Sequence, residues 1–133
     1  MTIRKQGEHV GLVHVSVKVL GGAGRSYDAN FLVDTGATDS MAPAQSLAKA
    51  GITPVGKLAY ELADGRIVEY EFGLAQIEFM GEITAGRVIF GPDDVEPLLG
   101  VTALESAGIV IDPRTGKLKR LPAIPLKRLR ATA

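Results

Sequence analysis

One run of the sequence combines residues that could do acid–base chemistry. Three apolar residues, Phe31 to Val33, lead directly into Asp34, and Thr35 and Gly36 follow. The apolar lead-in predicts a buried strand that ends at the carboxylate. Gly36 lets the backbone turn sharply and approach a ligand closely. Asp34 is therefore a candidate catalytic carboxylate, and the alternative is that it only caps the following loop through backbone amides, as Asp often does.

The rest of the chain offers little other catalytic chemistry. No second aspartate lies in an Asp-Thr-Gly or Asp-Ser-Gly context; the aspartates that lack it include Asp39, Asp64, Asp93, Asp94 and Asp112. Cysteine is absent, which excludes disulfides, thiolate metal sites and thiol nucleophiles. The two histidines, His9 and His14, are too few to assemble a histidine-rich metal shell. We therefore expect no metal and no cofactor.

Length and composition predict one ordinary globular domain. The chain has 133 residues, of which 46% are hydrophobic and 23% charged. We expect a single domain over residues 1–133, with its core at about 10–121 and a basic C-terminal tail at 122–133. The first eight residues are not followed by the apolar stretch of a secretory signal, and no apolar run approaches the roughly 20 residues that span a bilayer. The expectation is a soluble, cytoplasmic protein with no membrane contact.

Charge is unevenly distributed although the net charge is zero. Residues 113–133 hold seven basic side chains and no acid, whereas the preceding 112 residues hold fifteen acids and eight bases. A basic tail can contact nucleic acid. Here no aromatic residue lies between the basic ones, so bases have nothing to stack on. We interpret the tail as a solvated segment that balances an acidic body, and nucleic acid is not an expected partner.

The spacing of apolar and turn residues predicts a mostly β chain with short helices. Asp64-Gly65 between two alternating runs is typical of a β-hairpin, and Gly81-Glu82 marks another turn. Gly51 and Gly108 are placed to end the two helices. Strands are expected at 9–20, 25–34, 57–63, 66–73, 74–80, 83–90, 109–112 and 117–121, and helices at 43–50 and 101–107. Leu98-Leu99-Gly100 is a compact apolar step before the second helix.

The run Asp34-Thr35-Gly36-Ala37 resembles the active-site motif of the retropepsins, the retroviral-type aspartic peptidases. Two further features agree with that family, a flap hairpin at Tyr60 to Val68 and the step Leu98-Leu99-Gly100 before a helix. The resemblance covers about Val10 to Leu121. It implies a retropepsin-like closed β-barrel, the acid protease fold, with one or two short helices and one flap hairpin per chain.

The resemblance also implies an aspartic endopeptidase that is active as a homodimer. Two carboxylates about 3 Å apart share one proton, and the unprotonated one activates a water. Because the chain carries one motif, the second carboxylate is expected to be Asp34 of another copy. The catalytic residues implied are Asp34, Thr35 and Gly36. Those implied to bind a peptide or protein substrate are Ala37, Thr38, Asp39, Leu62, Ala63, Asp64, Gly65 and Arg66, and those implied to support the loop are Leu98, Leu99 and Gly100.

Two positions depart from the retroviral pattern. Retroviral enzymes commonly have Asp directly after the Ala of the motif and Arg directly after the apolar-apolar-Gly step, and these two form an ion pair. Here the positions hold Thr38 and Val101. Losing both partners avoids the cost of one buried unpaired charge. The dimer interface is therefore expected to be held in another way.

The Asp34 run allows three other interpretations. It also looks like the first phosphate loop of the actin and sugar-kinase ATPases, but that fold needs several hundred residues and a second phosphate loop. A magnesium-dependent phosphatase with a nucleophilic Asp usually has a second Asp two residues later, where this chain has Gly36. The third is a dimeric peptide-binding or scaffold module with the retropepsin fold and little or no catalysis, which the residues leave open.

Overall fold

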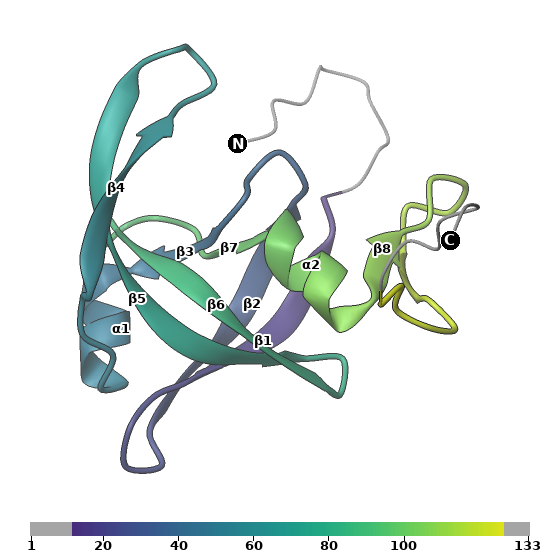
Figure 1. The fold of residues 1–133 in the computed structure, drawn as a ribbon, viewed down its shortest axis with the longest axis horizontal. Helices are drawn as coiled ribbons and strands as arrows, with labels where there is room; N and C mark the ends of the chain where they lie inside the picture. Colours follow the sequence, from purple (N-terminus) through teal and green to yellow (C-terminus); the bar gives the residue numbers. More distant parts are fainter. Residues whose placement is uncertain (1–11, 127–133) are drawn as a thin grey trace, which may run out of the picture.

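The computed structural model describes residues 12–126 and shows a mostly β fold with two short helices (Figure 1). Its elements in chain order are β1 His14–Leu20, β2 Ser26–Asp34, β3 Ser40–Pro43, α1 Ala44–Lys49, β4 Gly56–Glu61, β5 Ile67–Phe79, β6 Glu82–Gly91, β7 Leu98–Gly100, α2 Val101–Ala107, β8 Ile109–Ile111 and β9 Leu118–Arg120.

The main sheet closes on itself. Its strand order is β1-β2-β7-β3-β6-β5-β4, and β1 also pairs with the far half of β5, so that six strands form a barrel and β4 extends beyond it. Strands β8 and β9 form a separate two-stranded sheet. The predicted mostly β closed barrel with two short helices is confirmed.

Alternating apolar residues fill the barrel. On β1, Val17 and Val19 point inward and are almost inaccessible, because successive side chains of a strand face opposite sides. The run before Asp34 behaves differently, since Phe31, Leu32 and Val33 are all buried. This continuous burial is what the apolar lead-in predicts, and it carries the chain through the core to Asp34.

Strand β5 is longer than the sequence suggests. We expected a break at Gly73, but the structure has one strand of 13 residues from Ile67 to Phe79. A side chain at Gly73 would lie 2.8 Å from Ile52 Cγ2 and 3.0 Å from the carbonyl oxygen of Thr53. The glycine therefore allows close packing and does not mark a turn. The turn lies one residue earlier than expected, at Met80-Gly81, where both residues have positive φ.

Two short strands were not predicted as such. Strand β3 occupies residues 40–43, so Pro43 ends a strand and α1 begins at Ala44. The Leu98-Leu99-Gly100 step is itself a strand, β7, which pairs in parallel with β2 and contacts β3 through Met41. Neither strand is long enough to show a repeating pattern in the sequence.

Other boundaries match the sequence more closely. Helix α2 spans the predicted residues and ends at Gly108, whose φ of 71° is left-handed. The strands beside Asp64-Gly65 are shorter than expected, ending at Glu61 and resuming at Ile67. Strand β1 begins at His14; the start of the expected strand and the end of the basic tail lie outside the described residues.

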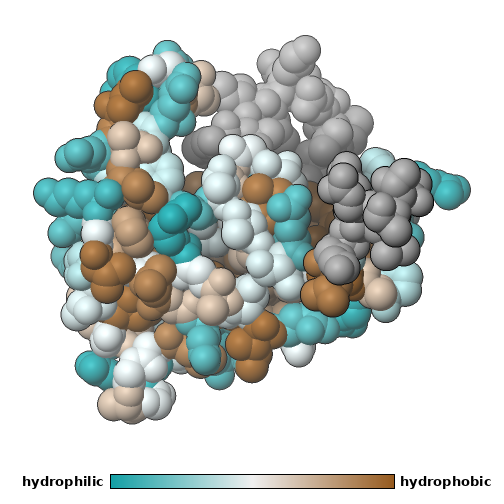
Figure 2. All heavy atoms as spheres, viewed as in Figure 1, coloured by the Kyte–Doolittle hydropathy of each residue, from teal (hydrophilic) through white to brown (hydrophobic). Residues whose placement is uncertain are grey.

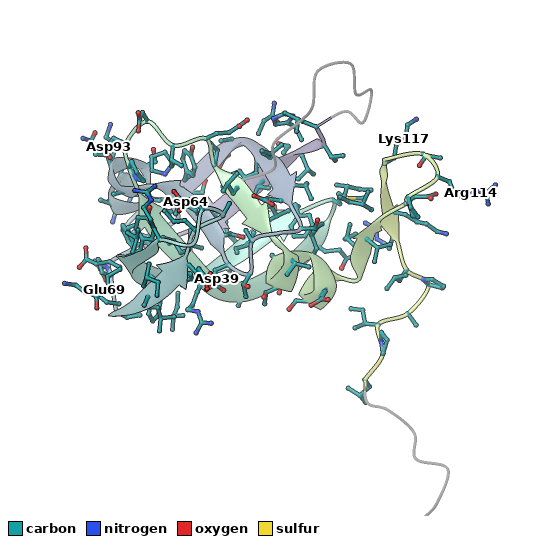
Figure 3. All side chains as sticks on the ribbon, turned by 90° about the horizontal axis from the view of Figure 1, so that it is seen from above. Asp39, Asp64, Glu69, Asp93, Arg114 and Lys117 are labelled. Atoms are coloured by element: carbon teal, nitrogen blue, oxygen red, sulfur yellow. The ribbon has the colours of Figure 1, made fainter. Side chains whose placement is uncertain are left out.

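The elements around the barrel extend in different directions. Figure 1 shows the β4–β5 hairpin rising on one side, with β8 and the loop after it on the opposite side. Figure 3 separates Asp39 and Asp64 at the hairpin side from Arg114 and Lys117 at the other end. On the face in Figure 2, hydrophobic residues lie mostly over the β4–β5 side among hydrophilic ones.

Within residues 12–126, neither helix has the length and apolar character to cross a membrane.

Candidate active site

Asp34 is the last residue of β2 and is 2% exposed. The backbone turns immediately after it. The amide of Gly36 donates to Asp34 Oδ1 at 3.0 Å, and the amide of Ala37 donates to the carbonyl oxygen of Asp34 at 3.1 Å. A Cβ at position 36 would lie 3.3 Å from the same Oδ1, which is tight. Glycine at this position thus lets the backbone amide reach the carboxylate.

Strand β7 and helix α2 hold the loop that follows Asp34. Asp34 pairs with Gly100 in the parallel β2–β7 ladder. The amide of Val101 donates to the carbonyl oxygen of Ala37 at 2.8 Å, and the amide of Thr102 to that of Thr38 at 3.2 Å. Amides in the first turn of a helix have no partner within the helix. Here the loop carbonyls accept from them, so α2 fixes the loop's shape.

Gly100 is required by the closeness of this packing. A Cβ there would lie 2.7 Å from the carbonyl carbon and oxygen of Asp39 and 2.8 Å from the carbonyl oxygen of Thr38. The Gly100 amide also donates to Ser40 Oγ at 3.0 Å. Leu99, beside it, is fully buried. The geometry agrees with the supporting role expected for the Leu-Leu-Gly step.

The loop after Asp34 and the β4–β5 hairpin enclose a cavity of about 680 Å³. Eight residues named from the sequence line it: Asp34, Gly36, Ala37, Thr38, Asp39, Leu62, Ala63 and Leu98. The lining further includes Met41, Ala59, Tyr60, Glu61, Tyr70 and Ile89, which the sequence reasoning did not single out. The other named residues, Thr35, Asp64, Gly65, Arg66, Leu99 and Gly100, are not among the residues that line it.

Asp39 joins the loop to the hairpin and to β6. Its side chain is 5% exposed. Oδ2 accepts a hydrogen bond from the Tyr60 hydroxyl at 2.7 Å and another from Arg87 Nε at 3.0 Å. Arg87 is half-exposed and lies over the ring of Phe72, with 5.6 Å between its guanidinium carbon and the ring centroid. We call Asp39, Tyr60 and Arg87 the Asp39 cluster.

The Asp39 cluster shifts the ionisation of its members. Burial, and then the hydrogen bond to Asp39, raise the pKa of Tyr60 from 10.0 to about 12. The hydrogen bond to Asp39 and its negative charge also raise the pKa of Arg87. Tyr60 is therefore a protonated donor, and Arg87 a cation, at any pH near neutral.

The sequence analysis did not predict that Tyr60 and Arg87 donate hydrogen bonds to Asp39. Tyr60 was noted only as the start of the hairpin, and Arg87 was not noted. The hairpin register could have indicated the first, because it puts Tyr60 opposite Val68 on the side that also carries Tyr70. Nothing local indicates Arg87, which is 48 residues from Asp39 in the chain.

The tip of the hairpin is a tight turn with its own bonds. The amide of Leu62 donates to the carbonyl oxygen of Arg66 at 2.8 Å, and that of Gly65 to Leu62 at 2.9 Å. Gly65 has a φ of 86°. Arg66 also pairs with Asp64 at 2.8 Å, with both side chains well exposed. The turn therefore keeps its shape independently of the loop below it.

The described residues contain no cluster of side chains that could bind a metal ion. No three His, Asp or Glu side chains gather within residues 12–126. His14 is exposed and lies 2.9 Å from Glu96, and His9 is outside the described residues. The reactive group in the cavity is therefore the Asp34 carboxylate, which accepts from the amide of Gly36 and lies beside apolar and aromatic walls.

Comparison with known proteins agrees with this geometry. The family described as "gag-polyprotein putative aspartyl protease" matches residues 23–106. This range includes Asp34 with the loop after it, residues 34–39, which we call the Asp34 loop, as well as the β4–β5 hairpin and most of α2. Among solved structures, the protease of simian foamy virus (mac) is similar, with 15% identity, a TM-score of 0.50, and coverage of 69% of this chain and 91% of that chain. The search of curated proteins returned no match.

The fold and the site define a retropepsin-like aspartic protease. The chain belongs to the gag-polyprotein aspartyl protease family.

Proposed function

We propose that this chain is an aspartic endopeptidase that acts as a homodimer, with one Asp34 from each copy. The observation that supports this most directly is the position of Asp34, which ends a buried strand and lines a cavity beneath a hairpin. Hydrolysis by this route needs two carboxylates, and the sequence supplies one such motif per chain. A second copy, related by a twofold axis beside the loop, would supply the other carboxylate.

The proposed reaction uses one proton shared by the two carboxylates. The unprotonated Asp34 takes a proton from a water held between the pair, and the oxygen of that water bonds to the scissile carbonyl carbon. The protonated Asp34 gives its proton to the carbonyl oxygen, which stabilises the tetrahedral intermediate. The carbon–nitrogen bond then breaks as the nitrogen takes the proton held by the dyad and one hydroxyl of the intermediate returns its own proton to the dyad, which restores the starting state.

The residues next to Asp34 have the exposure that this arrangement needs. Thr35 is exposed on the single chain, where its hydroxyl is available for a contact with a second copy. Gly36 is exposed as well and lines the cavity. We assign Thr35 to locking the two loops together and Gly36 to contact with the substrate backbone.

An extended peptide is the substrate form that fits the cavity. It would lie between the loop at Ala37 to Asp39 and the hairpin, which acts as a flap. Leu62 and Ala63 line the cavity from the flap, and the tip at Asp64 to Arg66 would close over the peptide. Backbone hydrogen bonds would give affinity, and pockets for alternate side chains would give selectivity.

The dimer would be held without the retroviral Asp–Arg pair. At Thr38 and Val101 the structure has backbone bonds in place of charges, with the amides of Val101 and Thr102 donating to Ala37 and Thr38. Asp39, the carboxylate next to Thr38, forms an ion pair with Arg87 of the same chain. Because these groups are satisfied internally, we infer that the exposed Thr35 and the rest of the loop surface make the contact between copies.

The test is peptide cleavage by wild-type protein and by Asp34→Asn. Asn has nearly the same shape but cannot accept a proton as a general base, so cleavage should be lost while the dimer persists on a sizing column. The peptide library is digested from about pH 3 to about pH 7, the acidic range that a mechanism with one shared proton favours. A wild-type dimer that binds peptides but cuts none of them in this range would contradict the proposal.

One observation favours a second candidate, a dimeric peptide-binding module of the same fold. In the single chain Asp34 is 2% exposed, whereas a catalytic carboxylate must reach water and substrate. Binding of the same peptides by wild-type and Asp34→Asn protein, with no cleavage by either, would identify the module.

A further inference from the structure

The Asp39 cluster draws together three segments that are distant in the chain. Asp39 comes from the loop after Asp34, Tyr60 from β4 near the flap tip, and Arg87 from β6 in the barrel wall. Two donors meet the same oxygen, Oδ2 of Asp39. The proton transfers proposed above involve only the Asp34 pair, a water and the peptide, so the convergence of these three side chains calls for another role.

Arg87 accounts for the burial of Asp39. A carboxylate that is 5% exposed is costly unless it is paired and hydrogen-bonded. Arg87 gives both an opposite charge and a donor at 3.0 Å, and the ring of Phe72 beneath it restricts its movement. With Arg87 in place the carboxylate is already paired. The hydroxyl of Tyr60 is thus an additional contact, from the flap.

Tyr60 lies where a single bond could control the flap. It is two residues before Leu62, whose backbone closes the tip turn. Asp39 is five residues after Asp34, in the same loop. Both Tyr60 and Asp39 line the cavity, so the hydrogen bond between them crosses from one wall to the other. The ring of Tyr60 also packs near that of Tyr70, with centroids 6.3 Å apart.

We propose that Tyr60 is a positioning residue whose hydroxyl, bound to Asp39, ties strand β4 of the flap to the Asp34 loop and so sets the width of the peptide groove. This inference rests on the proposed peptidase function. The bond leaves the self-contained tip turn able to open for substrate while the strand below it stays in register. Asp39 is the acceptor in the loop through which Tyr60 acts, and Arg87 holds the Asp39 side chain in place.

The raised pKa of Tyr60 agrees with this role. The phenol keeps its proton well above neutral pH, so the hydroxyl donates throughout the range in which the enzyme would work. Asp39 and Arg87 are the charged groups that act on it. Ionisation of Tyr60 therefore does not break the contact near neutral pH.

The test removes only the hydroxyl, with Tyr60→Phe. The ring contact with Tyr70 and the Asp39–Arg87 pair are kept. We expect the KM for a cleavable peptide to rise roughly threefold to tenfold, the effect of one hydrogen bond to a charged group acting on closure, with kcat changed less than twofold. Tyr27→Phe is the matched control, since Tyr27 lies on β2 against Phe31, away from the cavity.

Amide hydrogen exchange of the free protein provides a readout that does not depend on cleavage. In Tyr60→Phe, exchange should become faster at residues 56–61 of β4, and in Tyr27→Phe it should match the wild type. Asp39→Ala should show the same faster exchange, and adding Tyr60→Phe to it should change nothing further. This pair of variants forms a cycle that isolates the contact.

The possible outcomes distinguish the role of the Tyr60–Asp39 hydrogen bond from the peptidase function itself. Unchanged exchange in β4 together with an unchanged KM would overturn the positioning role, and so would a loss of kcat with KM unchanged. Should wild-type protein cleave no peptide, the proposed function fails, while exchange in the free protein still decides whether Tyr60 holds the flap.

Discussion

At the scale of the residue, the two buried carboxylates of the site differ in the groups that donate hydrogen bonds to them. Asp34 is held by the amide of Gly36 within its own turn. Asp39 is held by side chains from two other strands. The two carboxylates are close in sequence and both are buried, yet their partners differ in kind. Asp34 thus accepts from a backbone amide of its own turn, whereas Asp39 accepts from a tyrosine hydroxyl and from an arginine.

The Tyr60 hydroxyl should make stability depend on pH in the alkaline range. Its pKa of about 12 in the folded chain exceeds the 10.0 of a free tyrosine, so the folded state holds the proton more tightly. That contribution is fully present below about pH 10 and is lost as the pH rises towards about 12. We expect the difference in free energy of unfolding between wild type and Tyr60→Phe to be constant from about pH 7 to about pH 9 and to shrink above about pH 10.

Urea unfolding at each pH measures this difference, and Tyr27→Phe gives the baseline for an ordinary tyrosine. A difference that grew with rising pH would show that Tyr60 is not held as a donor.

Gly100→Ala should damage both stability and activity. The added Cβ would lie 2.7 Å from the backbone of Asp39, so either the loop or β7 must move. We expect a loss of about 1–3 kcal/mol in the free energy of unfolding, as for overpacked sites, and a large loss of cleavage because the moved loop carries Asp34. Gly22→Ala is the control, since a Cβ there meets nothing within 4 Å and its φ is not positive. Full activity in Gly100→Ala would argue against a rigid loop.

At the scale of the element, strand pairing explains what could and could not be predicted. Helix α2 and its end at Gly108 were read correctly, because a left-handed glycine after an apolar-periodic run is a local signal. The Asp34 loop was also recognised from local residues. Strand β7 was noted only as an apolar step, because its three residues become a strand only by lying between β2 and β3. Arg87 reaches Asp39 only through the same closure of the barrel.

Gly73 was misread for the same reason, since a glycine that permits close packing looks the same in sequence as one that permits a turn. Gly73→Ala should lower the free energy of unfolding by about 1–3 kcal/mol through contacts with Ile52 and Thr53. Cleavage per folded molecule should be unchanged, because Gly73 does not line the cavity.

Thermal or urea unfolding together with cleavage at low temperature would separate the two effects. Gly86→Ala on the neighbouring strand β6 is the control, since its Cβ meets no atom within 4 Å. A Gly73→Ala protein as stable as Gly86→Ala would mean that the packing at β5 is looser than the structure shows.

At the scale of the whole molecule, the described chain presents half of the proposed machinery at one end of a barrel. The cavity lies beside the flap hairpin, and Arg114 and Lys117 lie at the other end of the molecule from Asp64 (Figure 3). Arg114 and Lys117 are thus remote from the hairpin tip at Asp64.

Mixing wild-type protein with Asp34→Asn should therefore suppress activity. With a tenfold excess of the variant, random pairing places most wild-type chains in dimers that hold one aspartate, and the rate per wild-type chain should fall roughly tenfold. Cleavage after re-equilibration, at saturating peptide, measures this. If each chain acted by itself, the rate per wild-type chain would be the same with and without the variant.

The bonds that shape the Asp34 loop join partners far apart in the chain, as with Ser40 and Gly100, which are 60 residues apart. Contacts of such separation form late in folding, because a long segment must first be closed. During synthesis, Asp34 is made long before β7 and α2 can reach it. We therefore expect the loop after Asp34 to take its final shape only once Gly100, Val101 and Thr102 have been made and can bond to it.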